Sequence, residues 1–202
     1  MILRVAVGAL GAVAVLFCLA VTGAAEHPGA ASPASAPSVP TWSVGTTAPV
    51  AAVADPKPVR LRIPAIDVDT PLIDIGTDAA GALIPPTAAD VAGWFTAGPV
   101  PGAVGPALLA GHVDSHAGPG VFYRLVDLRP GDRVEVDRAD GTRVTFAVAA
   151  TTRAPKTAFP TDLVYAPAPG PELRLVTCGG AFDRAVRSYR DNIIVEAVLT
   201  LG

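Results

Sequence analysis

The sequence predicts an all-β domain, folded as a barrel or a sandwich, behind an apolar N-terminal segment and a proline-rich linker. Short runs of alternating apolar and polar residues recur through residues 59–202, and helical periodicity is scarce. The chain of 202 residues also contains 20 Gly and 21 Pro, which favour turns between short elements. Strands at this spacing, without long helices, are typical of β-barrels and β-sandwiches.

The expected strands follow one another closely along the domain. Those predicted from alternating or buried-type runs are 59–63, 66–75, 107–112, 133–136, 143–148, 173–177 and 193–198. Asp140-Gly141 is a typical hairpin turn between the fourth and fifth of these strands. Helical turns are expected only around 88–94 and 121–125.

The N-terminal 58 residues differ in composition from the rest of the chain. Residues 5–25 form 21 positions without a charge, which as a helix would span ~30 Å, enough for a bilayer core. Arg4 precedes this run and places the N-terminus in the cytoplasm. A cleaved signal peptide is the alternative, but the run is longer than a usual h-region. We therefore expect a single-pass membrane anchor at 1–25 with the remainder outside the cell.

Residues 26–58 contain seven prolines among Ala, Ser, Thr and Val, a composition that favours extended chain and predicts a linker. Residues 59–202 then form the folded domain, which is long enough for a single core. A single anchored domain needs no partner subunit, so a monomer is expected.

Composition excludes several classes of function. Fifteen basic and 18 acidic residues give a net charge of -3, which argues against a nucleic-acid partner. Two cysteines, Cys18 and Cys178, are too few for a disulfide-rich scaffold. No cluster of His, Cys and acidic residues has the spacing of metal ligands, so neither a metal nor another cofactor is expected.

Cys178 has no expected disulfide partner, because Cys18 falls within the predicted membrane span. An unpaired thiol in an exported domain is a liability unless it has a use. Cys178 ends an apolar run and is followed by Gly179-Gly180, which would leave it accessible to a peptide. The alternative is a buried cysteine that acts as a small hydrophobic residue.

His112 ends another apolar run, so it is expected at the same rim of the barrel as Cys178. A thiol and an imidazole together support nucleophilic acyl transfer, in which the histidine protonates the leaving amine. His116 lies in the middle of a Gly/Pro loop and is expected to be less firmly positioned.

Acyl transfer also needs a donor for the developing oxyanion. Arg190 is the preferred candidate, because it is close to the start of the last expected strand and its guanidinium suits a carbonyl or an oxyanion. Arg184 and Arg187 lie nearby in the sequence and compete for the role.

These residues resemble the signature of the sortases, membrane-anchored cysteine transpeptidases of Gram-positive bacteria. The similar stretches are Leu109-Ala-Gly-His112, Asp127-Leu-Arg-Pro-Gly-Asp132, Leu175-Val-Thr-Cys178 and the later Arg190. Two further strings, Cys178-Gly-Gly-Ala-Phe-Asp183 and Ser188-Tyr-Arg-Asp-Asn192, most resemble the actinobacterial sub-group called class F. The resemblance covers nearly all of residues 59–202, and the order and spacing of the motifs make it specific.

The resemblance implies a closed eight-stranded β-barrel with Cys178, His112 and Arg190 at one rim. Family members cleave a C-terminal sorting signal of the LPXTG type between Thr and Gly through a thioester, and then transfer the protein to an amine of a cell-wall precursor. Thr177 is expected to help position the substrate backbone, and residues 153–171 to shape the substrate groove. No acidic cluster matches the calcium site of some sortases, so no metal is implied.

Three alternatives remain open at the level of the sequence. An L,D-transpeptidase is also a β-rich cysteine acyltransferase, but its histidine comes just before its cysteine, whereas His112 and Cys178 are far apart in the chain. A non-enzymatic extracellular β-domain, an adhesin or a binding module, would have a buried and inert Cys178. A degenerate, inactive sortase is the third alternative, and no motif supports it.

Overall fold

The structure is a computed structural model that describes residues 55–200. The expected membrane anchor and almost all of the expected linker lie outside the described residues. Within the described part of the chain, no helix combines the length and the apolar character needed to cross a membrane.

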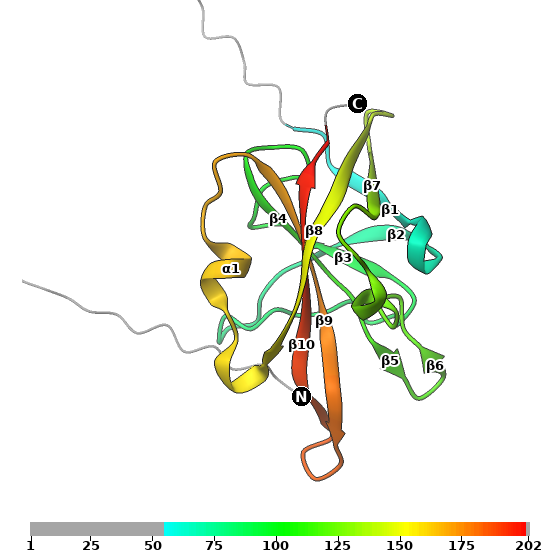
Figure 1. Ribbon diagram of the computed structural model, residues 1–202, viewed down its shortest axis with the longest axis vertical. Coiled ribbons are helices and arrows are strands. Elements are labelled where there is room, and N and C mark those ends of the chain that lie inside the picture. Colours follow the sequence, from blue (N-terminus) through cyan, green and yellow to red (C-terminus); the bar gives the residue numbers. More distant parts are fainter. Residues whose placement is uncertain (1–54, 201–202) are drawn as a thin grey trace, which may run out of the picture. The chain divides into compact units, whose positions relative to one another are not determined.

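Eight strands form a closed barrel in the order β1-β2-β3-β4-β9-β10-β8-β7 (Figure 1). Their bounds are β1 Pro58–Ile63, β2 Val68–Ile75, β3 Ala92–Phe95, β4 Gly105–Ala110, β7 Arg133–Arg138, β8 Arg143–Pro155, β9 Pro171–Asp183 and β10 Ser188–Leu199. Neighbouring strands are antiparallel except for the pairs β2–β3 and β4–β9. The predicted closed eight-stranded barrel is confirmed.

Shorter elements connect these strands. Two-residue strands β5 (Asp114–Ser115) and β6 (Gly118–Pro119) form a small hairpin after β4. The helical elements are the 3-10 turns η1 (Pro64–Ile66), η2 (Leu125–Asp127) and η3 (Lys156–Ala158) and the helix α1 (Thr161–Tyr165). Of the two expected helical turns, the one around 121–125 is present as a turn that leads into η2.

Apolar side chains gather in two places. The main cluster fills the barrel with fully buried residues such as Leu61, Phe146 and Leu175. A second cluster lies between the other faces of the central strands and the segment around α1, and it includes Leu108, Val164 and Ile194. Because β4, β9 and β10 contribute to both clusters, they are covered on both faces and read as continuous apolar runs in the sequence.

The expected helical turn around 88–94 is wrong, because Ala92–Phe95 is strand β3. It pairs in parallel with β2, and Gly93 lies opposite Ile73. A Cβ on Gly93 would lie 2.4 Å from the Ile75 side chain, so glycine allows the two strands to approach. A strand of four residues shows no clear alternation of apolar and polar residues, so this element could not be recognised from the sequence.

Strands β9 and β10 are both longer than expected. The prediction that Cys178 and Arg190 lie outside their strands is wrong, because β9 continues to Asp183 and β10 begins at Ser188. The Gly179-Gly180 pair is not a strand end: Gly180 has a φ of +74° beside a register shift between Tyr189 and Asp191. These glycines mark a bulge, where an irregular backbone leaves little room for a side chain.

Candidate active site

Strands β4 and β9 bring the predicted histidine and cysteine together. They are parallel neighbours, with Ala110 opposite Val176, and the Gly111 amide donates a hydrogen bond of 3.2 Å to the Val176 carbonyl. Continuing this register by two residues places His112 alongside Cys178. This register brings the backbone that follows β4 next to Cys178, which lies within β9, and the meeting of the two side chains at one rim stays a prediction.

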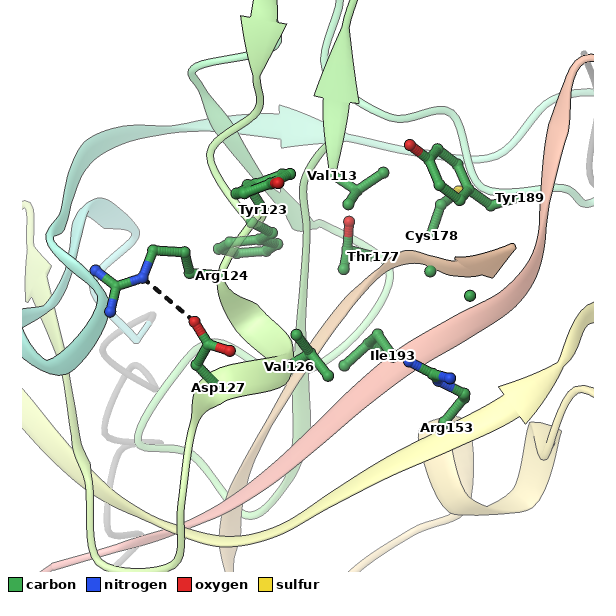
Figure 2. Close-up of a pocket in the computed structure, with 13 residues that line it drawn as sticks. Val113, Tyr123, Arg124, Val126, Asp127, Arg153, Thr177, Cys178, Tyr189 and Ile193 are labelled. Atoms are coloured by element: carbon green, nitrogen blue, oxygen red, sulfur yellow. Dashed lines mark hydrogen bonds and ion pairs between the residues drawn. The ribbon is translucent and has the colours of Figure 1, made fainter. Parts of the chain in front are cut away.

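Cys178 is a free, partly exposed thiol that lies between two cavities. The first, of about 400 Å³, is lined by Val113, Phe122, Tyr123, Arg124, Val126, Asp127, Arg153, Thr177, Cys178, Gly179, Gly180, Tyr189 and Ile193 (Figure 2). The second, of about 320 Å³, is lined by Asp78, Ala82, Leu83, Ile84, Pro85, Ala110, Gly111, Lys156, Val176, Thr177, Cys178 and Asn192. A group bound in either cavity can therefore reach the sulfur.

His112 is held from several sides. Its Nε2 lies 2.6 Å from the Pro86 carbonyl oxygen, and since a carbonyl only accepts, Nε2 is the donor. Its own carbonyl accepts a hydrogen bond of 2.9 Å from the Phe122 amide, and a Cβ on Gly120 would lie 2.5 Å from that oxygen. These contacts leave Nδ1 as the ring nitrogen available for proton exchange. His116, by contrast, is exposed at the tip of the β5–β6 hairpin.

Thr177 contributes to both cavities. Its side chain is 4 % exposed, and its Oγ1 has no hydrogen-bond partner among residues 55–200. Figure 2 shows this hydroxyl directed toward the side of the cavity on which Val113 lies. The Thr177 hydroxyl is thus buried at the cavity wall without a partner, and its contact with a substrate, which the resemblance implies, stays a prediction.

Arg190 lies at the register shift between β9 and β10 and lines neither of the two cavities that contain Cys178. Its side chain is 67 % exposed, and its Nη2 donates to Asp183 Oδ2 at 3.2 Å. It lines a third cavity with Lys156 and Ser188, and not the two that contain Cys178. To serve as an oxyanion donor, Arg190 has to leave Asp183 and turn toward the sulfur, so its role stays a prediction.

The pairing also affects Asp183. A hydrogen bond from the Ala185 amide, with a second from Arg190, holds the pKa of the Asp183 carboxyl below its usual value. The competing arginines Arg184 and Arg187 lie in the exposed turn between β9 and β10.

Arg153 is a candidate that the sequence did not single out. It lies on β8 opposite Ile193 of β10 and lines the cavity that contains Cys178. Figure 2 shows its guanidinium on the Cys178 side of that cavity, whereas Arg124 and Asp127 lie at the other end. The sequence placed Arg153 at the start of the predicted groove-shaping segment, but only the pairing of β8 with β10 brings it near the thiol.

Tyr189 joins the last strand to the hairpin that follows His112. Its hydroxyl donates a short hydrogen bond to the carboxylate of Asp114 on β5. This bond, followed by burial and by the charges of Asp114 and Cys178, raises the pKa of Tyr189 to about 12. Its ring packs edge-on against Phe182, with centroids 5.1 Å apart. Tyr189 thus closes one side of the cavity and ties β10 to β5.

Comparison with known proteins identifies the family. A sequence model of the sortase domain matches residues 61–200, which is more than half of the chain. The chain belongs to the sortase family. Sortases are cysteine transpeptidases, and this chain is an enzyme of that kind. No curated protein sequence matches it closely enough to be counted as a relative.

Solved structures of other sortases share the fold. Sortase A from Corynebacterium diphtheriae, a lid mutant, is similar with a TM-score of 0.56 and 25% identity, over 73% of this chain and 72% of that one. Sortase C-1 from Actinomyces oris gives a TM-score of 0.54 and 22% identity, over 74% of this chain and 77% of that one. The named relatives are therefore of classes A and C, and the resemblance to class F stays a prediction.

Proposed function

We propose that this sortase cleaves an LPXTG-type sorting signal between Thr and Gly and transfers the acyl part to an amine of a cell-wall precursor. The observation that carries this proposal is the position of Cys178 between two cavities. The cavity formed by Leu83, Ile84, Ala110 and Val176 is apolar and suits the Leu-Pro part of such a signal. The other cavity leaves room on the opposite side of the sulfur for the departing and incoming amines.

The residues at the site suit each step of this reaction. The Cys178 thiolate attacks the Thr carbonyl carbon, and Arg190, once it has left Asp183 and turned toward the sulfur, stabilises the oxyanion that forms. His112 gives its Nδ1 proton to the Gly amine as the C–N bond breaks, which leaves a thioester. The acceptor amine then attacks the thioester, His112 takes up its proton, and the sulfur departs as a thiolate. The enzyme returns to its starting state, and the reaction consumes only the sorting signal and the acceptor amine.

Peptide turnover tests the proposal. The full-length chain in detergent is incubated with a Leu-Pro-x-Thr-Gly peptide and an excess of an amine, and the products are weighed by mass spectrometry. We expect the Gly-containing tail and an amide of the Thr-ended fragment with the amine. A peptide left intact by freshly purified, reduced enzyme would contradict the proposed substrate class. A peptide of the same composition with Thr and Gly interchanged is the matched control.

We also propose that residues 1–25 anchor the enzyme in the cell membrane with the catalytic domain outside. The uncharged run of 21 residues after Arg4 supports this topology. Cell fractionation should place the full-length chain with the membranes, and external protease should degrade its domain on intact cells whose walls have been removed. Recovery of the full-length chain from the cytosol would overturn the topology.

A further inference from the structure

Asn192 lies beside the nucleophile on the neighbouring strand. It is the register partner of Cys178 in the antiparallel pair β9–β10, and directly opposite residues of such a pair share one face of the sheet. Both line the apolar cavity of about 320 Å³. The side chain of Asn192 is therefore adjacent to the reacting sulfur without being part of the predicted catalytic set.

The carboxamide of Asn192 is buried and incompletely used. The residue is 4 % exposed, and its Nδ2 has no hydrogen-bond partner in the described range 55–200. It is also the sole Asn in the 202-residue sequence, which contains no Gln. A buried donor without a partner destabilises a fold, so a partner that arrives with the substrate would account for it.

Two other polar side chains of this cavity have partners within the protein. Lys156 Nζ donates to Ser188 Oγ at 2.9 Å, and Asp78 Oδ1 accepts from the amides of Ala80 and Ala82. Asn192 Nδ2 and Thr177 Oγ1 are thus the buried side-chain polar atoms at this cavity that have no partner within residues 55–200. Most of the other residues that line the cavity are apolar, so they suit apolar side chains of a ligand.

We propose that Asn192 donates a hydrogen bond from Nδ2 to a backbone carbonyl of the sorting signal, between its apolar residues and the bond that Cys178 attacks. This inference rests on the proposed function. An extended Leu-Pro-x-Thr segment brings a carbonyl at every residue, whereas its proline brings no N–H. A donor in the enzyme is therefore the group that complements this peptide. Asn192 acts in binding and alignment of the acyl segment, and the thiol chemistry remains with Cys178.

Substitution by leucine of similar size separates this role from a structural one. Because Nδ2 makes no bond within the described protein, Asn192→Leu should leave the melting temperature unchanged or raise it. It should raise KM for the Leu-Pro-x-Thr-Gly peptide about tenfold, the loss of roughly one hydrogen bond, with a smaller effect on kcat. Alkylation of Cys178 by a small methanethiosulfonate reagent should proceed at the wild-type rate.

Thr70→Val is the matched control, because Thr70 is 3 % exposed and its hydroxyl donates to the Asp90 carbonyl at 3.0 Å, on β2. We expect it to lower the melting temperature and leave KM unchanged. Asn192→Ala is the second variant should leucine prevent folding, and it should raise KM in the same way.

The outcomes are distinguishable. Wild-type cleavage combined with an unchanged KM in both Asn192 variants would overturn the role of Asn192 alone. A raised KM accompanied by a lower melting temperature and slower alkylation of Cys178 would show that Asn192 stabilises the fold. That result would also overturn its proposed role in substrate binding. A wild-type enzyme that does not cleave the peptide would overturn the proposed function, and this inference with it.

Discussion

Three side chains carry the proposed chemistry, and the structure relates them unequally. His112 and Cys178 follow from adjacent parallel strands, so their positions are set by the sheet. Arg190 depends on a bulge and is paired with Asp183 outside the thiol cavities. Substitutions at single residues therefore test the predicted roles of all three side chains, and Arg190 is the one whose position in the structure supports its role least.

The first prediction concerns the nucleophile. Cys178→Ala should abolish both cleavage and transfer while leaving the melting temperature close to that of the wild type. The residue is the only cysteine in the matched region 61–200, so no second thiol can replace it. Mass spectrometry of peptide products measures this. Appreciable cleavage by the alanine variant would contradict a covalent mechanism.

The second prediction compares two histidines. His112→Ala should reduce kcat/KM by about 10²–10⁴, the usual contribution of a positioned acid or base. His116→Ala should have a far smaller effect, because His116 is exposed on the hairpin tip. Steady-state turnover of one peptide by both variants decides between them, and the reverse ranking would move His116 into the site.

The third prediction concerns the oxyanion donor. Arg190→Ala should lower kcat by about 10²–10³, as for the loss of one such donor, and Arg190→Lys should also be impaired because the planar fork is lost. Alanine variants of Arg184 and Arg187 should remain close to wild type.

Arg153→Ala is the informative comparison for this assignment, because Arg153 lines the cavity of Cys178 in the structure. Near-normal turnover by Arg190→Ala, together with collapse of Arg153→Ala, would transfer the role to Arg153.

At the scale of elements, the hairpin β5–β6 and strand β10 form one side of the site. Asp114 and Tyr189 join them, and Tyr189 directly precedes Arg190, which lies opposite the bulge in β9. The link therefore connects the loop that follows His112 with the segment that carries the predicted oxyanion donor. Its loss should affect both stability and turnover.

The fourth prediction uses the pH dependence of this link. The pKa of Tyr189 is raised from 10.0 to about 12, first by its hydrogen bond to Asp114. The protonated phenol is the favoured form, so the stabilisation is complete below pH 10 and is lost as the pH rises to about 12. Tyr189→Phe should lower stability by about 1 kcal/mol at neutral pH, for one partly exposed hydrogen bond.

Urea unfolding of the wild type and the phenylalanine variant, followed from pH 8 to 12, measures this effect. The difference between the two proteins should shrink between pH 10 and 12. A constant difference over that range would show that the Tyr189 hydroxyl does not stabilise the fold through Asp114.

At the scale of the whole molecule, the closed barrel supports the site through its interior. Phe146 on β8 is fully buried in the main cluster, and it is distant in the sequence from Cys178. Closure leaves no free sheet edge, and the covered outer faces of β4, β9 and β10 form the walls from which the apolar cavity is built.

The fifth prediction tests this support. Phe146→Ala should reduce the free energy of unfolding by about 3–5 kcal/mol, because a large buried ring is lost from a close-packed core. Phe182→Ala is the matched control: Phe182 is 50 % exposed, and its loss should cost about 1 kcal/mol. Chemical denaturation measures both, and equal losses would contradict the assigned core.

The sequence by itself determined the all-β class and most strands, and it predicts that a thiol and an imidazole act together. Apolar runs that end near Cys178 and His112 carry this information locally, since strand period and turn residues depend on near neighbours. The family followed from short motifs in a fixed order, and the family match over 61–200 agrees with it.

Only the tertiary structure decided which groups share the cavities. Arg153 lines the first Cys178 cavity through the pairing of β8 with β10, and Asn192 lines the second through its register opposite Cys178. The Gly179-Gly180 pair reads as a strand end in the sequence, yet forms a bulge within β9 because β10 continues the ladder beyond it. Such contacts join residues far apart in the chain. The alternating pattern that predicts a strand depends only on nearby residues, so it does not indicate which other strand will pair with it.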